Sequence, residues 1–460
     1  MNEVLIMNEH AWYQNAIFYH LYPLGLVGAP EKHHIGAAVE LRLNQLYPWI
    51  GHAQSLGTNA LFLGPVFEAS THGYDIRDYY QVDRRLGDNP SFARFSEAVH
   101  QRGMRLVLDA VFHHVGREFW AFRDVLEKGE NSPYVDWFAN IRFGETSPFG
   151  DPFSYESWQG HYALVKLNLA NPHVRAHLFD AVRLWMDEFN IDGLRLDAAD
   201  CIDFEFLRAL REVVKARRED FWLMGEVVHG NYSEWVNPVT LDSVTNYASY
   251  KGLFSSLKDK NYFEIAHTLD NQFGTQGRYK GLYLYNFVDN HDVDRVTSKL
   301  LDDRLLYPLY LLLYTMPGIP SIYYGSEWGL QGVKGKHTDA PLRPKLDLDT
   351  LNNNPRLPDL PGVLRTLGDI RQGSGAIRHG DFRLVFVDHQ QFAFTRRSDD
   401  EMVLVILNSD GRDVQLNLHI PGNNGQLIDL LNPGQTFTAV EGNLQVSIPP
   451  TWGRILKAAR

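Results

Sequence analysis

The chain has 460 residues, and its 44 Lys and Arg against 56 Asp and Glu give a formal charge of −12. This acidic balance argues against a nucleic-acid-binding protein, which needs a basic face. A hydrophobic fraction of 44% is typical of a globular chain, and the single cysteine, Cys201, excludes an intramolecular disulfide and a multi-cysteine metal site.

The N-terminus contains no basic segment followed by an apolar run, so the sequence predicts no secretory signal. No stretch approaches 18 uncharged apolar residues, the length needed to cross a membrane. The longest candidate, Leu305 to Tyr324, is interrupted by three prolines and is typical of a buried helix followed by a strand. We therefore expect a cytoplasmic protein that does not contact a membrane.

Eight short and mostly apolar segments alternate with longer amphipathic segments through the first three quarters of the chain. Nearly continuous apolar runs are typical of strands that are covered on both faces. Eight strand–helix units therefore predict an α/β fold, a closed parallel (β/α)8 TIM barrel. The predicted strands are Ala16–Leu24, Ala60–Phe67, Arg105–Phe112, Gly193–Ala198, Phe221–Val227, Ser243–Tyr247, Leu282–Val288 and Ser321–Tyr324.

Two regions depart from this alternation. Residues 115–165 are rich in Gly and Pro and too long for a structureless loop, so they predict a small subdomain inserted after the third strand. After about residue 375, short strand-like runs separated by turn clusters predict a C-terminal all-β sandwich. The predicted domains are thus the barrel (1–114 and 166–375), the inserted subdomain (115–165) and the C-terminal sandwich (376–460).

Charged side chains gather where the predicted strands end, which is where a parallel barrel carries its active site. A single carboxylate at a strand end is often only a helix cap. Several carboxylates that converge on one barrel mouth, together with Arg and His, indicate a catalytic site instead. The strand-end residues are Asp109, His113, His114, Arg195, Asp197, Glu226, His291 and Asp292.

Three carboxylates without a metal-binding motif suit glycoside hydrolysis, in which one carboxylate attacks the sugar and another protonates the leaving oxygen. Arg195 lies two residues before Asp197 on one strand, so both side chains point to the same face. We expect this cation to keep Asp197 ionised. Glu226 must instead stay protonated, and we expect repulsion from its carboxylate neighbours to raise its pKa.

Five motifs resemble those of the α-amylase family, glycoside hydrolase family 13. The four regions found after barrel strands occur in the family's order and spacing, and this combination is far more specific than any one of them alone. The motifs are HGYDIRDYY (residues 72–80), DAVFHHV (109–115), GLRLDAAD (193–200), MGEVVHG (224–230) and FVDNHD (287–292).

The resemblance implies roles for individual residues. Asp197 is then the nucleophile, Glu226 the acid/base and Asp292 the third carboxylate, while Tyr74 stacks on the sugar at the cleaved position. The other residues expected to bind that sugar are His72, Asp109, His114, Arg195, His291, Asp339 and Arg343.

Three departures from the family pattern refine these expectations. His113 stands where the family usually has an Asn that helps to bind calcium, and imidazole is a poor ligand for that ion, so we expect no metal and no cofactor. Asp200 and Cys201 replace a Lys-His pair that lines the leaving-group side in many starch amylases. The stretch 165–168, Val-Lys-Leu-Asn, resembles the neopullulanase and cyclomaltodextrinase branch.

The resemblance implies a retaining hydrolase of small or cyclic α-glucans, such as cyclodextrins, maltooligosaccharides or cyclic maltosyl-maltose. The alternatives are an α-glucosidase, an oligo-1,6-glucosidase or a glucan transferase of the same family. A non-catalytic barrel that serves as a partner subunit is disfavoured because Asp197 and Glu226 are both present.

Two further expectations concern the size of the substrate and the formation of a dimer. Trp120, Trp137 and Trp158 of the insertion are expected to narrow the barrel mouth, which favours a small glucan over starch. That branch commonly carries an N-terminal β domain that helps to form a dimer. About 15 residues precede the first predicted strand, so this domain is not expected, and a homodimer stays open.

Overall fold

The computed structural model describes residues 11–336, 338–353 and 355–459. The expectation that no secretory signal is present depends largely on residues 1–10, which lie outside the described residues. All eight predicted barrel strands are found in one parallel sheet, in the order β13-β12-β11-β5-β2-β1-β15-β14. Their bounds are β1 (Phe18–Leu21), β2 (Ala60–Leu63), β5 (Arg105–Ala110), β11 (Gly193–Leu196), β12 (Trp222–Gly225), β13 (Ser243–Val244), β14 (Tyr285–Asn286) and β15 (Ile319–Tyr323).

A parallel bridge between Thr245 and Tyr285 joins the two outer strands of this order, so the sheet closes into a barrel. Alternate residues of the strands face opposite sides. On β1, Phe18 belongs to the cluster that fills the barrel interior with Phe62 and Trp222, whereas Tyr19 belongs to the core beneath the helices. Burial on both faces explains why the strands are continuously apolar.

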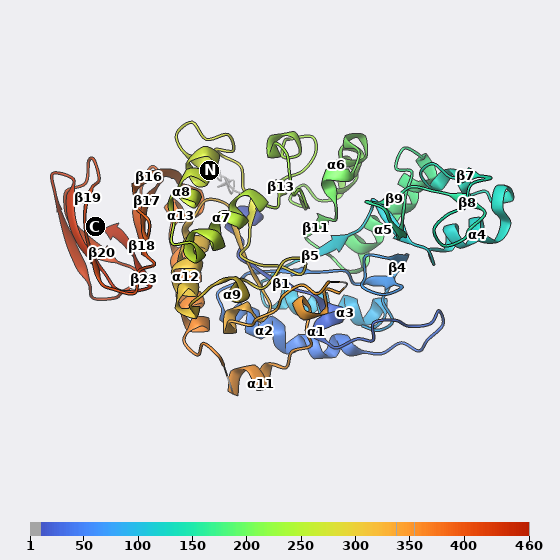
Figure 1. Ribbon diagram of the computed structural model, residues 1–460, viewed down its shortest axis with the longest axis horizontal. Helices are drawn as coiled ribbons and strands as arrows, with labels where there is room; N and C mark the ends of the chain where they lie inside the picture. Colours follow the sequence, from blue (N-terminus) through green and yellow to red (C-terminus); the bar gives the residue numbers. More distant parts are fainter. Residues whose placement is uncertain (1–10, 337, 354, 460) are drawn as a thin grey trace, which may run out of the picture.

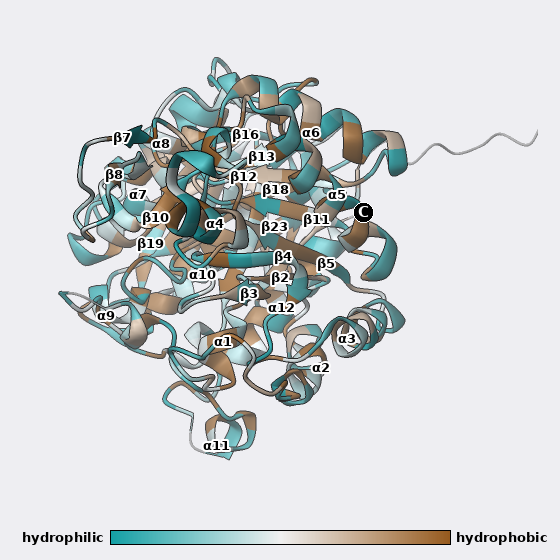
Figure 2. Ribbon diagram, turned by 90° about the vertical axis from the view of Figure 1, so that its right-hand side faces the viewer, coloured by the Kyte–Doolittle hydropathy of each residue, from teal (hydrophilic) through white to brown (hydrophobic). Residues whose placement is uncertain are grey.

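The helices cover the outside of the barrel, and their polar faces point to solvent (Figure 2). Several begin at a residue whose side chain accepts a hydrogen bond from the first turn, as Asp88 does before α3 and Asn171 before α5. The longer helices are α2 (Tyr47–Ser55), α3 (Asn89–Gln101), α5 (Pro172–Glu188), α6 (Phe204–Arg217), α7 (Tyr247–Lys258), α8 (Phe263–Phe273), α10 (Leu306–Thr315) and α12 (Leu360–Gly373).

Helix α10 differs from the others because all its residues except the half-buried Tyr307 are buried. It packs between α7 and α12 of the barrel and strands β18 (Met402–Asn408) and β23 (Trp452–Ala458) that follow it. This position explains the apolar segment noted in the sequence. Among the residues that the structure describes, no helix has the length and hydropathy needed to span a membrane.

The inserted segment stands at one end of the molecule, on the right in Figure 1. An antiparallel sheet of β6 (His114–Gly116), β10 (His161–Lys166) and β9 (Ser157–Trp158) ties it to the barrel, because β6 follows β5 and β10 precedes α5. Beyond this sheet lie α4 (Trp120–Lys128), β7 (Arg142–Phe143) and β8 (Phe153–Ser154).

The C-terminal region, on the left in Figure 1, is antiparallel. Its strands are β16 (Asp381–Val387), β17 (Gln391–Arg397), β18, β19 (Val414–His419), β20 (Gly425–Asp429), β21 (Thr436–Val440), β22 (Asn443–Ile448) and β23. Residues of β17 and β18 such as Ile406 pack against residues of β19 and β22 such as Leu418 and Val446, forming a sandwich core. The predicted fold class is confirmed, while the exact domain boundaries stay a prediction.

Candidate active site

Arg195 is the centre of the site at the barrel mouth. Its Nη1 lies 2.8 Å and 3.0 Å from the two carboxylate oxygens of Asp109 and 2.8 Å from Oδ1 of Asp197. Its Nη2 lies 2.8 Å from Oε2 of Glu226. One buried guanidinium therefore holds three carboxylates that come from β5 and from the ends of β11 and β12.

Glu226 is held on one oxygen and less constrained on the other. Oε2 forms the ion pair with Arg195 and accepts a hydrogen bond from the backbone N–H of Ala198 at 3.1 Å. Ala198 reaches this position because its backbone is left-handed, with φ 45°, a conformation that costs about 1–2 kcal/mol for a residue with a Cβ. Oε1 lies 3.4 Å from the hydroxyl of Tyr247. Because Arg195 and the Ala198 N–H both contact Oε2, Oε1 is the oxygen better placed to carry a proton when Glu226 is protonated.

Burial dominates the electrostatics of these carboxylates. It raises the pKa of Asp197 to about 7, with Arg195 opposing the shift and Asp109 and Asp292 adding to it. Burial also raises the pKa of Asp109 to about 6 and moves the pKa of Glu226 upward, with Arg195 again opposing. Arg195 favours the ionised form of Asp197, as expected, but burial outweighs this effect in the free protein, because one cation is shared among three carboxylates. Repulsion does raise the pKa of Glu226, but burial is the larger cause.

Asp292 has the opposite environment. Burial works against its charged form, but His291, Arg343 and Arg195 together hold the pKa of Asp292 well below the usual range. The Nη2 of Arg343 lies 2.9 Å from Asp292 and 3.1 Å from Asp339. Burial lowers the pKa of His291, so this ring is neutral near pH 7 and donates its Nε2 proton to Asp292 at 2.9 Å. Arg343 is therefore the cation nearest to Asp292.

Tyr74 connects the carboxylates around Arg195 with the group around Asp292. Its hydroxyl lies 2.9 Å from Oδ2 of Asp109 and contacts Nε2 of His291, and the rings of Tyr74 and His291 are stacked with centroids 5.5 Å apart. His72 accepts a hydrogen bond from the backbone N–H of Tyr74 at 3.2 Å. Asp109 is only 1% exposed, and both its oxygens are bound, so it lies behind Arg195 and Tyr74 rather than at the surface of the site.

His114 lies on the insertion side of the site. Its Nε2 is 3.9 Å from Oδ2 of Asp197 and has no hydrogen-bond partner in the described part of the chain. Burial lowers the pKa of His114 to about 3, so the ring is neutral. The Trp158 ring lies beside it at 5.9 Å and stacks on His161 at 5.4 Å.

Trp158 is thus the predicted tryptophan that contacts an active-site residue. Trp120 and Trp137 pack instead against each other and against His177 of α5, with ring centroids 5.3–5.7 Å apart. Trp120 and Trp137 therefore help to hold the insertion against α5, and whether they narrow the barrel mouth stays a prediction.

Three residues of the site were not predicted. Tyr22 lies between Arg343, whose Nη1 is 3.2 Å from the Tyr22 hydroxyl, and the stacked ring of His291. Asn290 accepts a hydrogen bond from the backbone of Asp292 at 2.8 Å and donates to Tyr247 at 3.3 Å. Tyr22 and Tyr247 lie in the last residues of predicted strands, so an inspection of strand ends that included tyrosine would have found both.

Comparison with known proteins places this site in a family. The family described as "Alpha amylase, catalytic domain" matches residues 49–356, about two thirds of the chain. The chain belongs to the α-amylase family of glycoside hydrolases. A second match, to the "Maltogenic Amylase, C-terminal domain", covers residues 382–455. The predicted family and the prediction of an enzyme are confirmed.

Relatives within the α-amylase family share most of the chain. A cyclomaltodextrinase of Bacillus sp is 31% identical over 89% of this chain and 75% of its own length, and neopullulanase 2 of Thermoactinomyces vulgaris is 33% identical over 88% and 68%. Among solved structures, the ligand-free cyclic alpha-maltosyl-(1→6)-maltose hydrolase from Arthrobacter globiformis has a TM-score of 0.81 at 28% identity and matches 98% of this chain and 100% of its own.

The residues at the expected calcium position do not fit that ion. His113 offers ring nitrogens, and its Nδ1 lies 3.3 Å from Nδ1 of His114. Burial, with Lys166 nearby, lowers the pKa of His113 to about 4. The neighbouring carboxylate, Glu156, is already paired with the ammonium of Lys166 at 2.8 Å. Calcium prefers six to eight oxygen ligands, which this set does not provide.

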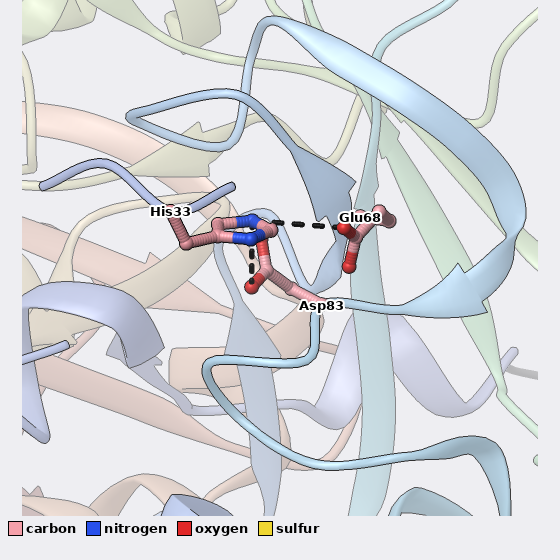
Figure 3. Close-up of side chains that lie close together, drawn as sticks. All are labelled: His33, Glu68 and Asp83. Carbon is pink, nitrogen blue, oxygen red and sulfur yellow. Dashed lines mark ion pairs between the residues drawn. The ribbon is translucent and has the colours of Figure 1, made fainter. Parts of the chain in front are cut away.

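A second group of side chains that could bind a metal ion lies away from the active site, at His33, Glu68 and Asp83 (Figure 3). The Nε2 of His33 is 3.6 Å from Glu68 and 3.9 Å from Asp83. Both carboxylates are already neutralised, because Arg84 contacts Glu68 at 2.9 Å and Arg85 contacts Asp83 at 2.6 Å. Guanidinium groups therefore supply the positive charge that a metal ion would bring.

Proposed function

We propose that this α-amylase-family enzyme hydrolyses α-glucosidic bonds, mainly α-1,4, in small or cyclic maltooligosaccharides, with retention of configuration. The observation that carries the proposal is the pairing of Asp197 and Glu226 on the two terminal nitrogens of Arg195. This arrangement keeps two carboxyl groups close together at the barrel mouth, as double displacement requires. The names of the relatives support cyclic and small maltooligosaccharides as the substrate class.

In this mechanism Asp197, in its ionised form, attacks the anomeric carbon. Glu226 gives the proton on Oε1 to the glycosidic oxygen as the bond breaks. The resulting glycosyl-enzyme is then hydrolysed by a water molecule that Glu226 deprotonates, which restores both groups. Arg195 keeps the two side chains in place, and its charge stabilises Asp197 as the leaving group in the second step.

The remaining residues hold the sugar at the cleaved position. Asp292 stays anionic and accepts hydroxyl groups of a ring that gains positive charge. Arg343 and Asp339 hold the Asp292 carboxylate and the sugar in position. Tyr74 offers its ring face to the sugar. The neutral imidazoles of His72, His114 and His291 are available to form hydrogen bonds with its hydroxyl groups. Asp109 is a positioning residue, because it reaches Arg195 and Tyr74 but not the surface of the site.

We infer a narrow site, which would favour a small substrate. Trp158 and His161 of the inserted sheet stand beside His114, so they offer stacking faces close to Asp197. On the other side, the carboxylate of Asp200 faces the backbone N–H of Val228, in the loop that follows Glu226. We therefore expect kcat/KM on a cyclodextrin or short maltooligosaccharide to exceed that on soluble starch by about tenfold or more, a difference of about 1.4 kcal/mol in transition-state binding.

The test is a product analysis on a panel of cyclic and linear glucans. Hydrolysis that yields maltose supports the proposal. Equal kcat/KM on starch and on small glucans, per cleavable bond, would indicate a general α-amylase. Release of glucose or formation of longer chains would indicate the α-glucosidase or glucan transferase alternatives.

The pH dependence follows from the carboxylate environments. Asp197 acts ionised, so activity is lost as pH falls through its pKa; Glu226 acts protonated, so activity is lost as pH rises through its own. Because burial raises the pKa of Asp197 to about 7, we expect the acid limb of kcat/KM in the neutral range rather than near the ordinary value of about 4. The test is to measure kcat/KM as a function of pH, over the range in which the melting temperature shows that the protein stays folded. An acid limb near pH 4 would contradict the expectation.

We also propose that the enzyme needs no metal ion. The nitrogen-rich surroundings of His113 and the arginine-neutralised carboxylates near His33 support this. Dialysis against EDTA should leave both kcat and the melting temperature unchanged. A fall of several degrees that added calcium reverses would contradict the expectation. The homodimer and the cytoplasmic location stay predictions from the sequence.

A further inference from the structure

A cavity of about 410 Å³ lies at the end of the barrel opposite to the active site. Its walls come from the segments that lead into β14 and β15, from the end of α13 (Gly375–His379) and from the start of β16, so it lies between the barrel and the C-terminal sandwich. Figure 1 shows α8, α13, β16 and β17 side by side in this region. We call it the basal cavity. Its charged lining residues are Lys280, Arg378, His379, Asp381 and Arg396.

Positive charge exceeds negative charge in the basal cavity. Asp381 supplies the one carboxylate among the described lining residues, and Lys280 already binds it at 2.9 Å. Arg378 donates to the side chain of Asn15 at 2.6 Å, and His379 contacts Asn15 and Tyr283. Within the described residues, neither Arg378 nor Arg396 forms an ion pair with a carboxylate.

Arg396 is the most unusual of these groups because it is only 1% exposed. Its guanidinium donates to the carbonyl oxygens of Gly380 and Thr315 at 2.8–3.1 Å. A second arginine, Arg371, lies behind the wall with 0% exposure, donates to the carbonyl oxygens of Tyr314 and Gly318, and has a buried Nε without a described partner.

The carbonyl contacts explain only part of this charge. Thr315 and Tyr314 end α10, and the C-terminus of a helix carries about half a negative charge, which favours one nearby cation. It does not compensate three neighbouring guanidinium groups, two of them fully buried, since an unpaired buried charge is strongly unfavourable. Burial and the mutual proximity of the arginines accordingly lower the pKa of Arg371 to about 10 and of Arg396 to about 9.

We propose that the basal cavity binds a small phosphorylated sugar, whose phosphate monoester pairs with the half-buried Arg378 and is attracted by the positive charge of Lys280 on the rim and of Arg396 in the wall. A phosphate monoester carries close to two negative charges at neutral pH, and guanidinium groups bind it through paired hydrogen bonds. The cavity is larger than an inorganic ion needs and within the range of small-ligand sites. The half-buried Tyr283 supplies a ring face for the sugar, and the exposed Asp381 is placed to accept its hydroxyl groups.

The ligand contacts both domains at once, so its binding stabilises the folded protein against separation of the sandwich from the barrel. The site is distant from Asp197 and Glu226, and therefore the ligand acts on stability rather than by competing with the glucan.

The test uses glucose 6-phosphate, inorganic phosphate and glucose as probes, with calorimetric titration and thermal unfolding of the full chain. We expect glucose 6-phosphate to bind and to raise the melting temperature, phosphate to bind at least several-fold more weakly, and glucose to have no effect at concentrations up to about 10 mM. Glucose 6-phosphate should leave KM for a maltooligosaccharide unchanged. No binding of glucose 6-phosphate, equal affinity for phosphate, or competitive inhibition of hydrolysis would each overturn the proposal.

Variants locate the site. Arg378 lies in the half-buried wall of the cavity. Arg378→Gln should weaken the binding of glucose 6-phosphate about tenfold or more, because one charge-assisted hydrogen-bonding group is lost. Arg383→Gln is the matched control, since it makes the same charge change at an exposed position of β16 outside the cavity. Lys280→Gln, on the exposed rim, does not depend on the folding of Arg378→Gln and should also weaken the binding of glucose 6-phosphate, because it removes a positive charge beside the phosphate. Equal binding by all three variants would place the ligand elsewhere and overturn the proposal.

Discussion

Asp197→Asn and Glu226→Gln should each lower kcat by about 10⁴-fold or more while the protein stays folded. Both carboxyl groups form or break bonds to the reacting atoms, so the loss falls on the transition state rather than on substrate binding. Asn and Gln keep the side-chain volume and an oxygen that accepts from Arg195. Steady-state rates on a short maltooligosaccharide, together with circular dichroism and the melting temperature, measure both effects.

The melting temperature of Asp197→Asn should not fall below that of the parent enzyme. The variant removes one of three carboxylates that share a single buried cation, and with it the burial penalty that raises the pKa of Asp197. Asp200→Asn, at an exposed position three residues along the chain, is the matched control and should keep most of the activity. Retention of about 10% of kcat by either active-site variant would contradict the assigned roles.

Arg343→Gln is expected to lower kcat/KM by about 10²-fold, which corresponds to about 2.7 kcal/mol of transition-state stabilisation. The Nη2 of Arg343 contacts both Asp292 and Asp339. The Nε of Arg343 donates to the backbone oxygen of His291 at 2.9 Å. Without this cation, Asp292 loses its nearest positive charge, and its pKa rises toward the usual range. The Asp292 carboxylate is then held less firmly and carries less negative charge, so it binds the sugar more weakly.

Arg343→Lys should recover part of the loss, because it restores the charge but not the planar fork that spans two carboxylates. Arg356→Gln provides the control for loss of a surface ion pair, since Arg356 contacts only Asp303 among the described carboxylates. A change of less than about threefold in kcat/KM for Arg343→Gln, with the fold intact, would show that Arg343 does not act on the sugar site.

The barrel was predictable from the sequence because its strands are buried on both faces and therefore continuously apolar. The hairpin of β3 (Phe67–Ala69) and β4 (Ile76–Val82) was not predicted, nor was β21. β4 and β21 mix buried positions with partly or fully exposed ones, and β3 is only three residues long, so their hydrophobic pattern is weak. Such strands form because tertiary pairing holds them, which a local pattern does not reveal.

The composition of the site was also predictable, since strand ends of a parallel barrel converge. Its electrostatics were not. Proximity in sequence correctly placed Arg195 next to Asp197, but it did not reveal that Asp109 and Glu226 share the same guanidinium or that the group is buried. The direction of the Asp197 pKa shift depends on these long-range contacts. Likewise, Trp120 and Trp137 lie in the predicted insertion, but only the folded structure shows that they pack on His177 rather than beside His114.

The central claim is that Asp197 forms a covalent bond to the sugar. A 5-fluoro α-glucosyl fluoride reacts with such a nucleophile and slows the second step, so the glycosyl-enzyme accumulates and peptide mass spectrometry locates it. The account predicts one added glycosyl group on the peptide that contains Asp197, absent in Asp197→Asn, and a first hydrolysis product of α configuration by NMR. A label on another residue, or a first product of β configuration, would contradict the account.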